Sequence, residues 1–276
     1  MNVAVLSGKG GTGKTTISTN LALALGASYI DCDVEEPNGF LFLKPNIENT
    51  KKVMVEYPVI DDDKCTDCSA CADICQFNAL ASTGNSILLF EKLCHGCGAC
   101  KIVCSCGALD YGKREVGKIE EGMGHGINCS RGVLNIGEPM AVPVIKGLLK
   151  NLEGRLNIID CPPGTSCNVV MSLRYADSAI LVTEPTKFGL HDLKRAVELV
   201  EKFDIPFGVI INKDDNRENI VKSYCKERQI KIIGTVPYSD SIALTYSKGE
   251  MLYDNLENKA VFDNLAMRLG EVLEWT

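Results

Sequence analysis

Residues 8–16, Gly-Lys-Gly-Gly-Thr-Gly-Lys-Thr-Thr, form a glycine-rich loop between two segments with different hydrophobic patterns. Residues 2–6 form a short, mostly apolar run, as in a buried strand, whereas residues 15–25 carry apolar residues at helical spacing. In a strand–loop–helix unit of this kind, backbone N–H groups and a helix N-terminus point toward one place, which suits phosphate groups. The loop therefore predicts an α/β fold with a nucleotide site where the helix begins.

The loop also predicts individual phosphate contacts. Lys14 should reach the outer phosphates, and the Thr15 hydroxyl is placed to bind Mg2+. The predicted nucleotide-binding residues of the loop are Gly8, Gly10, Gly11, Thr12, Gly13, Lys14, Thr15 and Thr16. A glycine turn without a ligand is the alternative, and the strand and helix that flank the loop argue against it.

The rest of the chain alternates short apolar runs with amphipathic segments. The predicted strands cover residues 27–30, 156–159, 179–183, 207–211 and 231–236. The predicted helices cover residues 142–152, 192–202, 220–228 and 258–275. Such alternation is typical of a doubly wound parallel sheet. A length of 276 residues is sufficient for one such domain with a small one attached.

Two cysteine runs with the same spacing, C-x2-C-x2-C-x3-C, interrupt this alternation and lie 29 residues apart. In such a run the three closely spaced cysteines bind one [4Fe-4S] cluster and the fourth binds the other. The predicted ligands of cluster 1 are Cys65, Cys68, Cys71 and Cys104, and those of cluster 2 are Cys75, Cys94, Cys97 and Cys100. Zinc is the alternative, but eight cysteines in this double arrangement fit zinc sites poorly.

The cysteine runs predict an insertion in the sheet domain. We expect a discontinuous core of residues 1–57 and 113–276, and an inserted small α+β domain of residues 58–112. The glycine-rich residues 113–138 are predicted to form short strands and turns. The six remaining cysteines are expected to pack as small apolar residues. Cys106, close to a predicted cluster, and Cys129, in the glycine-rich segment, are singled out as exceptions.

The glycine-rich loop carries a second lysine, Lys9, directly after its first glycine. With it the chain resembles the deviant Walker A P-loop ATPases of the MinD, ParA, Mrp and nitrogenase iron protein group, over nearly all of its length outside the insertion. The insertion resembles a bacterial two-cluster ferredoxin, except that Gln76 and Ser105 replace the proline that usually follows the fourth cysteine. The resemblance implies a homodimer in which Lys9 reaches the partner's nucleotide. A solvated loop lysine is the alternative.

The resemblance also implies roles for residues outside the loop. Asp33 would position or activate the attacking water, so that Lys9, Lys14 and Asp33 are the expected catalytic residues of ATP hydrolysis to ADP and phosphate. The expected magnesium site combines Thr15, Asp31 and Asp160. Gly164 would approach the terminal phosphate, and Asn212 and Pro237 would lie at the base. An ordinary turn residue is the alternative for Asn212.

Charge and hydropathy exclude several classes of function. The net charge of -7 gives no basis for binding nucleic acid or an anionic membrane. No segment approaches the roughly 18 to 20 apolar residues that span a bilayer, and the first residues are unlike a secretory signal. The closing segment is acidic, with Glu257, Asp263, Glu271 and Glu274 against Lys259 and Arg268, unlike a basic membrane-targeting helix. We therefore expect a cytoplasmic protein that binds neither nucleic acid nor membrane.

The two predicted sites together indicate a function that uses ATP/ADP, Mg2+ and two [4Fe-4S] clusters. The leading hypothesis is slow, partner-stimulated ATP hydrolysis that moves or gates the ferredoxin insertion and so controls electron transfer. The alternative is an ATP-dependent carrier or assembly factor that delivers an iron–sulfur or other metal cofactor to a client protein. A third hypothesis is a redox-sensing module on a regulatory switch. The partner would be an unidentified redox protein or client.

Overall fold

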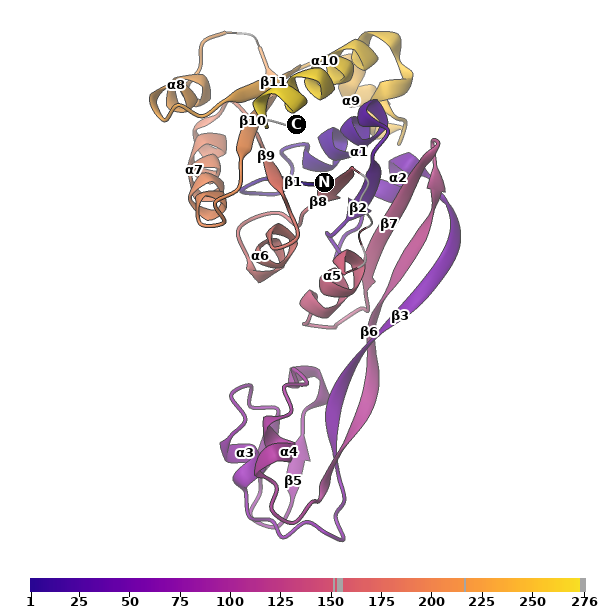
Figure 1. Ribbon diagram of the computed structural model, residues 1–276, viewed down its shortest axis with the longest axis vertical. Coiled ribbons are helices and arrows are strands. Elements are labelled where there is room, and N and C mark those ends of the chain that lie inside the picture. Colours follow the sequence, from indigo (N-terminus) through magenta and orange to yellow (C-terminus); the bar gives the residue numbers. More distant parts are fainter. Residues whose placement is uncertain (151, 153–155, 216, 274–276) are drawn as a thin grey trace. The chain divides into compact units, whose positions relative to one another are not determined.

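The computed structural model describes residues 1–150, 152, 156–215 and 217–273. They form two compact units (Figure 1). The nucleotide unit contains residues 1–51 and 119–133 and the described part of 145–276, and the cysteine unit contains residues 52–118 and 134–144. The cysteine unit thus includes both cysteine runs. In the described part of the chain, no helix is long and apolar enough to cross a membrane.

A nine-stranded sheet runs through the described residues in the order β11-β10-β9-β1-β8-β2-β7-β6-β3. Its strands are β1 (Asn2–Leu6), β2 (Ser28–Asp31), β3 (Asn46–Ile60), β6 (Leu109–Gly124), β7 (Ile127–Leu134), β8 (Asn157–Asp160), β9 (Ser178–Thr183), β10 (Phe207–Asp214) and β11 (Ile232–Pro237). Every neighbouring pair from β11 to β7 is parallel. The predicted parallel sheet and its short strands are confirmed.

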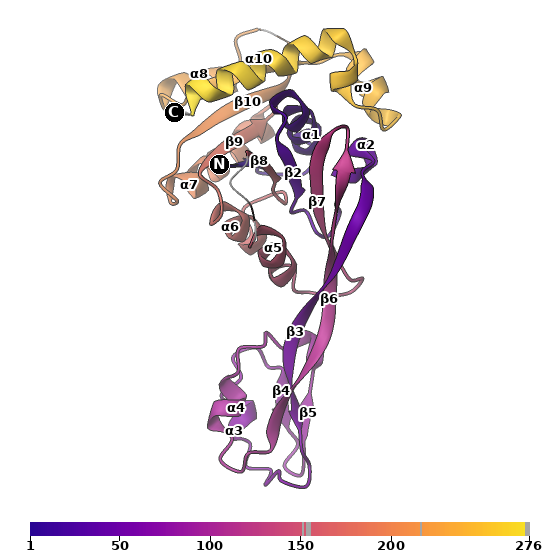
Figure 2. The same ribbon diagram turned by 45° about the vertical axis from the view of Figure 1, so that its right-hand side comes forward.

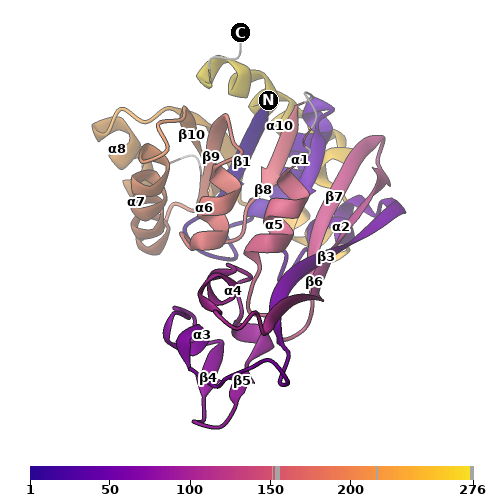
Figure 3. The same ribbon diagram turned by 60° about the horizontal axis from the view of Figure 1, so that its bottom comes forward.

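Helices pack on both faces of this sheet (Figures 2 and 3). They are α1 (Lys14–Leu25), α2 (Gly39–Leu43), α5 (Val142–Leu149), α6 (Cys167–Leu173), α7 (Lys187–Glu201), α8 (Ile220–Glu227), α9 (Asp240–Ser247) and α10 (Leu256–Val272), with a 3-10 turn at Leu252–Asp254. Helices α1 and α10 pack together on one face, and α6 and α7 lie on the other (Figure 3). The predicted closing helix is present as α10, while Glu274 and Trp275 lie outside the described residues.

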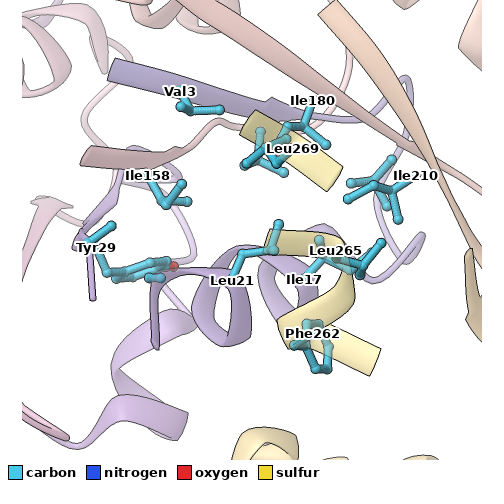
Figure 4. Close-up of a cluster of buried hydrophobic side chains, with 14 of the residues drawn as sticks. Val3, Ile17, Leu21, Tyr29, Ile158, Ile180, Ile210, Phe262, Leu265 and Leu269 are labelled. Carbon is cyan, nitrogen blue, oxygen red and sulfur yellow. The ribbon is translucent and has the colours of Figure 1, made fainter. Parts of the chain in front are cut away.

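The core beneath α1 and α10 is continuous and apolar. Val3, Ile158, Ile180 and Ile210 point from four neighbouring strands toward the two helices (Figure 4). The helices contribute Ile17 and Leu21 from α1 and Phe262, Leu265 and Leu269 from α10, all with at most 2% of their surface exposed. Because the last residues of the glycine-rich loop form the first turn of α1, this packing holds the loop in place at the end of β1.

The prediction of short strands and turns for residues 113–138 is wrong. Strand β6 alone covers 16 residues, and a two-residue turn at His125 and Gly126 joins it to β7. Both turn residues have positive φ, 48° and 79°, as a type I′ hairpin requires. The glycines misled the interpretation because they allow close backbone approach: a Cβ at Gly122 would lie 2.0 Å from the Asn46 carbonyl oxygen.

The cysteine unit is built from two similar halves, with the short helices α3 (Ala70–Asp73) and α4 (Ala99–Val103), a 3-10 turn at Glu91–Leu93, and the antiparallel strands β4 (Leu80–Ser82) and β5 (Ile87–Leu89). Positive φ angles recur at an offset of 29 residues, in the pairs Asp67 and Gly96, Ser69 and Gly98, and Asn78 and Gly107. The bond from Phe90 N–H to the Ala79 carbonyl matches that from Asp61 N–H to the Ala108 carbonyl, both 2.8 Å. The sequence repeat is therefore also a repeat of backbone structure.

Candidate functional site

The glycine-rich loop is shaped by its glycines. Gly11 and Gly13 have positive φ, 80° and 85°, and Gly13 precedes the first residue of α1. A Cβ at Gly8 would lie 2.3 Å from the Asp192 carbonyl oxygen on α7, so only glycine fits there. The loop therefore presents a left-handed turn directly before a helix N-terminus, an arrangement that suits phosphate oxygens.

Lys14 and Asp160 form a buried ion pair beside this loop, with Nζ and Oδ1 2.6 Å apart. The Ser18 hydroxyl donates to the same carboxylate oxygen at 3.0 Å, and the Tyr29 hydroxyl donates to Oδ2 at 2.9 Å. Asp31 and Asp160 are register partners on the parallel strands β2 and β8, so both carboxylates lie at the same edge of the sheet. The structure thus brings Lys14, Asp31 and Asp160 together at one buried point.

The carboxylates at this edge carry shifted pKa values. Burial, with the neighbouring Asp160 charge, raises the pKa of Asp31 to about 7. Burial also raises the pKa of the half-buried Asp33 to about 6, against the opposing effect of Lys14. Burial disfavours the charge on Lys14, but the carboxylates of Asp160, Asp31 and Asp33 together outweigh it and hold the Lys14 pKa above its ordinary value. The site therefore concentrates negative charge that a cation stabilises.

The remaining residues predicted at the phosphates also lie near this edge. Asp33 is half-buried two residues after β2, and its N–H donates to Asp31 Oδ1 at 3.1 Å. Gly164 has φ 86°, and its N–H donates to the Ser7 carbonyl at 2.9 Å, which places the Asp160-Cys-Pro-Pro-Gly segment against the glycine-rich loop. Thr15 and Lys9 are partly exposed at the two ends of the loop.

A pocket of about 410 Å³ is lined by Gly11 and Gly13 of the loop and by both residues predicted at the base, Asn212 and Pro237. The Asn212 amide N–H donates to the Thr12 carbonyl at 2.8 Å, and its oxygen accepts from the Lys213 N–H at 3.0 Å. A Cβ at Gly13 would lie 2.2 Å from this amide nitrogen. Asn212 therefore holds the glycine-rich loop, and the pocket beside it has a largely apolar wall.

Sequence reasoning missed three aromatic residues at these sites. Tyr238 and Tyr246 line the pocket beside Pro237, but they lie after the last strand and on α9, where no motif marks them. Tyr29 lies two residues before Asp31 on β2 and contacts both aspartates, with its hydroxyl 3.2 Å from Asp31 Oδ2. The alternation of side chains along a strand was a usable signal for Tyr29, since residues two apart share a face.

In the cysteine unit, the predicted cluster ligands line two pockets. The other residues in the walls of these pockets are mainly apolar. Pocket 1 is lined by Cys65, Cys68, Cys71 and Cys104, and also by Cys106. Pocket 2 is lined by Cys75, Cys94, Cys97 and Cys100. Each pocket thus takes three thiols from one run and the fourth from the other run. Among the described residues, there is no group of three or more His, Cys, Asp or Glu side chains placed to hold a single metal ion.

Backbone N–H groups point at the pocket sulfurs. Ala79 N–H donates to Cys75 Sγ at 3.3 Å, and the bond from Ala108 N–H to Cys104 Sγ repeats it 29 residues later, also at 3.3 Å. Gly96 N–H donates to Cys94 Sγ at 3.4 Å. Hydrogen bonds to the sulfurs are among the features by which a protein sets the reduction potential of an iron–sulfur cluster.

Three comparisons place the chain among known proteins. The model of the CobQ/CobB/MinD/ParA nucleotide binding domain matches residues 3–252. An uncharacterised protein of Methanocaldococcus jannaschii is 35% identical over 270 residues, which cover 94% of each chain. An iron-sulfur cluster carrier protein of Pyrococcus horikoshii is 27% identical over 243 residues, covering 84% of this chain and 66% of that protein.

The fold has a solved counterpart as well. The septum site-determining protein MinD of Pyrococcus horikoshii, complexed with Mg-ADP, has a TM-score of 0.61 and 18% identity, covering 97% of this chain and 95% of that one. The family match includes the glycine-rich loop together with Asp31, Asp33 and Asp160. The chain therefore belongs to the CobQ/CobB/MinD/ParA nucleotide-binding family and is an ATP-binding P-loop ATPase of the MinD/ParA type.

Proposed function

We propose that this ATPase uses its nucleotide cycle to control electron transfer through two [4Fe-4S] clusters held in the cysteine unit. One observation carries the proposal: a single chain contains the P-loop site and two pockets that each collect the four predicted ligands of one cluster. When bound, the clusters supply one-electron transfer. The chain contributes the thiolates, the N–H bonds to their sulfurs and the apolar walls.

The pockets fit a cluster better than a zinc ion. Zinc holds its four ligands within about 2.3 Å of one centre, and the described residues contain no such convergent group. A [4Fe-4S] cube is wider, and its four irons each take one cysteine. Burial raises the pKa of the Cys71 and Cys100 thiols, so cluster binding should release protons from these two sites.

The nucleotide site supplies a change of partners that can act as the switch. Lys14 is paired with Asp160, and it must leave this carboxylate to reach the outer phosphates. Asp160 is then available to Mg2+ with Thr15 and Asp31, while Asp33 orients the attacking water. Nucleotide and Mg2+ thus make contacts when Lys14 is on the phosphates that are absent when Lys14 is paired with Asp160. A nucleotide-driven switch requires such a difference between its two states.

The proposal includes a homodimer formed across the nucleotide site. Lys9 is partly exposed beside the loop, so its side chain is available to a second copy. Asn212 and Pro237 would hold the base in the pocket of about 410 Å³. Sedimentation with MgATP tests this step: a dimer that Lys9→Ala abolishes supports it, and an unchanged dimer contradicts the role of Lys9.

Delivery of a cluster to a client protein is the second candidate function. It is supported by the Pyrococcus horikoshii relative, which is named an iron-sulfur cluster carrier protein and aligns with 84% of this chain. In this case the clusters would leave the cysteine unit, whereas electron transfer requires them to stay and change oxidation state.

Anaerobic electron paramagnetic resonance of the reduced protein, with and without MgATP, tests the proposal. About eight irons per chain are expected, with signals that change on addition of MgATP while the iron stays bound. Loss of iron to an added apo-ferredoxin, dependent on MgATP, would favour delivery instead. Cys97→Ala should remove one cluster, and Cys167→Ala, an exposed cysteine outside both pockets, serves as the matched control. A wild-type chain that takes up no iron would refute the cluster assignment.

A further inference from the structure

The two halves of the cysteine unit repeat each other, but the walls of their two pockets contain different side chains at equivalent positions. In pocket 2 the rings of Phe77 and His95 stack with centroids 3.9 Å apart and line the wall. At an offset of 29 residues, the counterpart of Phe77 is Cys106 and that of His95 is Thr66. Pocket 1 therefore has a thiol in the position where pocket 2 has an aromatic ring.

This fifth thiol lies next to one of the four predicted ligands. Cys106 lines pocket 1, and its Sγ lies 3.6 Å from Cys104 Sγ. At that separation both sulfurs face the same corner of the pocket. In pocket 2, Phe77 takes this place, so Cys75 has no neighbouring thiol two residues away.

The backbone after Cys104 is less restricted than its counterpart. Gly107 has φ 66° and no atom within 4 Å of an added Cβ, whereas Asn78 holds the equivalent position in the first half. Ser105 stands where a proline usually follows the fourth cysteine of such runs, as Gln76 does in the first half. A segment with glycine and without proline can change its φ angles more easily, so it can bring either sulfur forward.

We propose that Cys104 and Cys106 are interchangeable ligands for the same iron of the cluster in pocket 1, which gives this pocket an exchangeable corner that pocket 2 lacks. This proposal rests on the proposed cluster function. In the exchange, the bond from iron to Cys104 sulfur breaks and a bond from iron to Cys106 sulfur forms. The proton that leaves the Cys106 thiol is taken up by the released Cys104 thiolate, and no electrons are gained or lost.

Iron content and electron paramagnetic resonance of anaerobically reconstituted variants test the exchange. Cys104→Ala should keep about eight irons per chain because Cys106 replaces the missing ligand, while the matched variant Cys75→Ala should keep about four. The double variant Cys104→Ala/Cys106→Ala should also keep about four. If Cys104→Ala alone falls to four irons, Cys106 does not substitute and the inference is wrong.

Wild-type protein provides a second measurement that does not depend on a variant folding. Brief alkylation of the cluster-loaded chain, followed by mass spectrometry of the peptide 102–113, should find single labels divided between Cys104 and Cys106. Labels confined to Cys106 would overturn the exchange. Because the wild-type iron content is measured first, a failure of the cluster assignment is distinguished from a failure of the exchange.

Discussion

The two units differ in what stabilises them. The nucleotide unit has a large apolar core that joins the strands to α1 and α10, and it buries the ion pair of Lys14 and Asp160. In the cysteine unit, the buried cluster between the two cysteine runs is small: among the described residues it consists of Leu80, Cys100 and Leu109, and one of them is a predicted cluster ligand. Units with so small a core usually depend on disulfides or metals. We therefore expect folding to be independent of binding in the nucleotide unit and coupled to metal binding in the cysteine unit.

Removal of iron should have the largest effect, and it should affect the two units differently. We expect a chelator to abolish amide protection in residues 60–110 while protection in α1 and the parallel strands is retained, because only the cysteine unit lacks an adequate core. Hydrogen exchange with mass spectrometry measures both units in one sample. Unchanged protection in residues 60–110 would show that this unit is stable without iron.

A substitution of the expected catalytic carboxylate should remove the function of the nucleotide unit without unfolding it, whereas removal of iron should unfold the cysteine unit. Asp33→Ala is expected to lower ATP turnover by about 100-fold or more while nucleotide binding is retained, because Asp33 is half-buried outside the Lys14–Asp160 pair. Steady-state turnover and equilibrium binding measure the two effects. Glu36→Ala, an exposed carboxylate nearby, is the control, and full turnover in Asp33→Ala would contradict the assignment.

The buried carboxylates of the nucleotide unit should make its stability depend on pH. The pKa of Asp31 is raised to about 7, and an unfolded aspartate has a pKa near 3.9, so the folded chain holds the proton longer. The stability that the folded chain gains by keeping Asp31 protonated is therefore lost as pH rises from about 4 through 7. Asp31→Asn should stabilise the unit by about 1 to 3 kcal/mol at pH 8 and progressively less toward pH 4.

Denaturant unfolding at several pH values checks this prediction, with Mg2+ binding measured alongside. The same variant should bind Mg2+ more weakly, because it removes a carboxylate from the expected magnesium site. A gain in stability that does not vary with pH would mean that Asp31 is already neutral or that the new amide packs differently.

The smallest effect should come from the unequal backbones of the two halves of the cysteine unit. Ser69 has φ 63° where its counterpart Gly98 has φ 80°. Ser69→Gly should stabilise the iron-loaded unit by up to about 1 kcal/mol, because glycine adopts this conformation without strain. Gly98→Ser should destabilise it, since an added Cβ would also lie 2.8 Å from the Tyr111 hydroxyl. Thermal denaturation compares the pair, and equal midpoints would show that neither angle is strained.

Local patterns were sufficient for most of the nucleotide unit. The apolar runs at β1, β8 and β9 are continuous because those strands are buried on both faces, so length and composition identify them. Local patterns did not identify β3, where most side chains are exposed, or β6, where the glycines at 122 and 124 lie against a neighbouring backbone. In these strands the neighbour, rather than the local sequence, determines the conformation.

Sequence patterns alone were enough to locate a glycine-rich loop before a helix, aspartates after parallel strands, and two cysteine runs of equal spacing. Only the tertiary structure decided that Lys14 pairs with Asp160, that Tyr29 joins them, and that Cys106 lies beside Cys104. The physical reason is that spacing along the chain specifies local geometry. Contacts between distant segments depend on how the strands pair and how side chains pack between them.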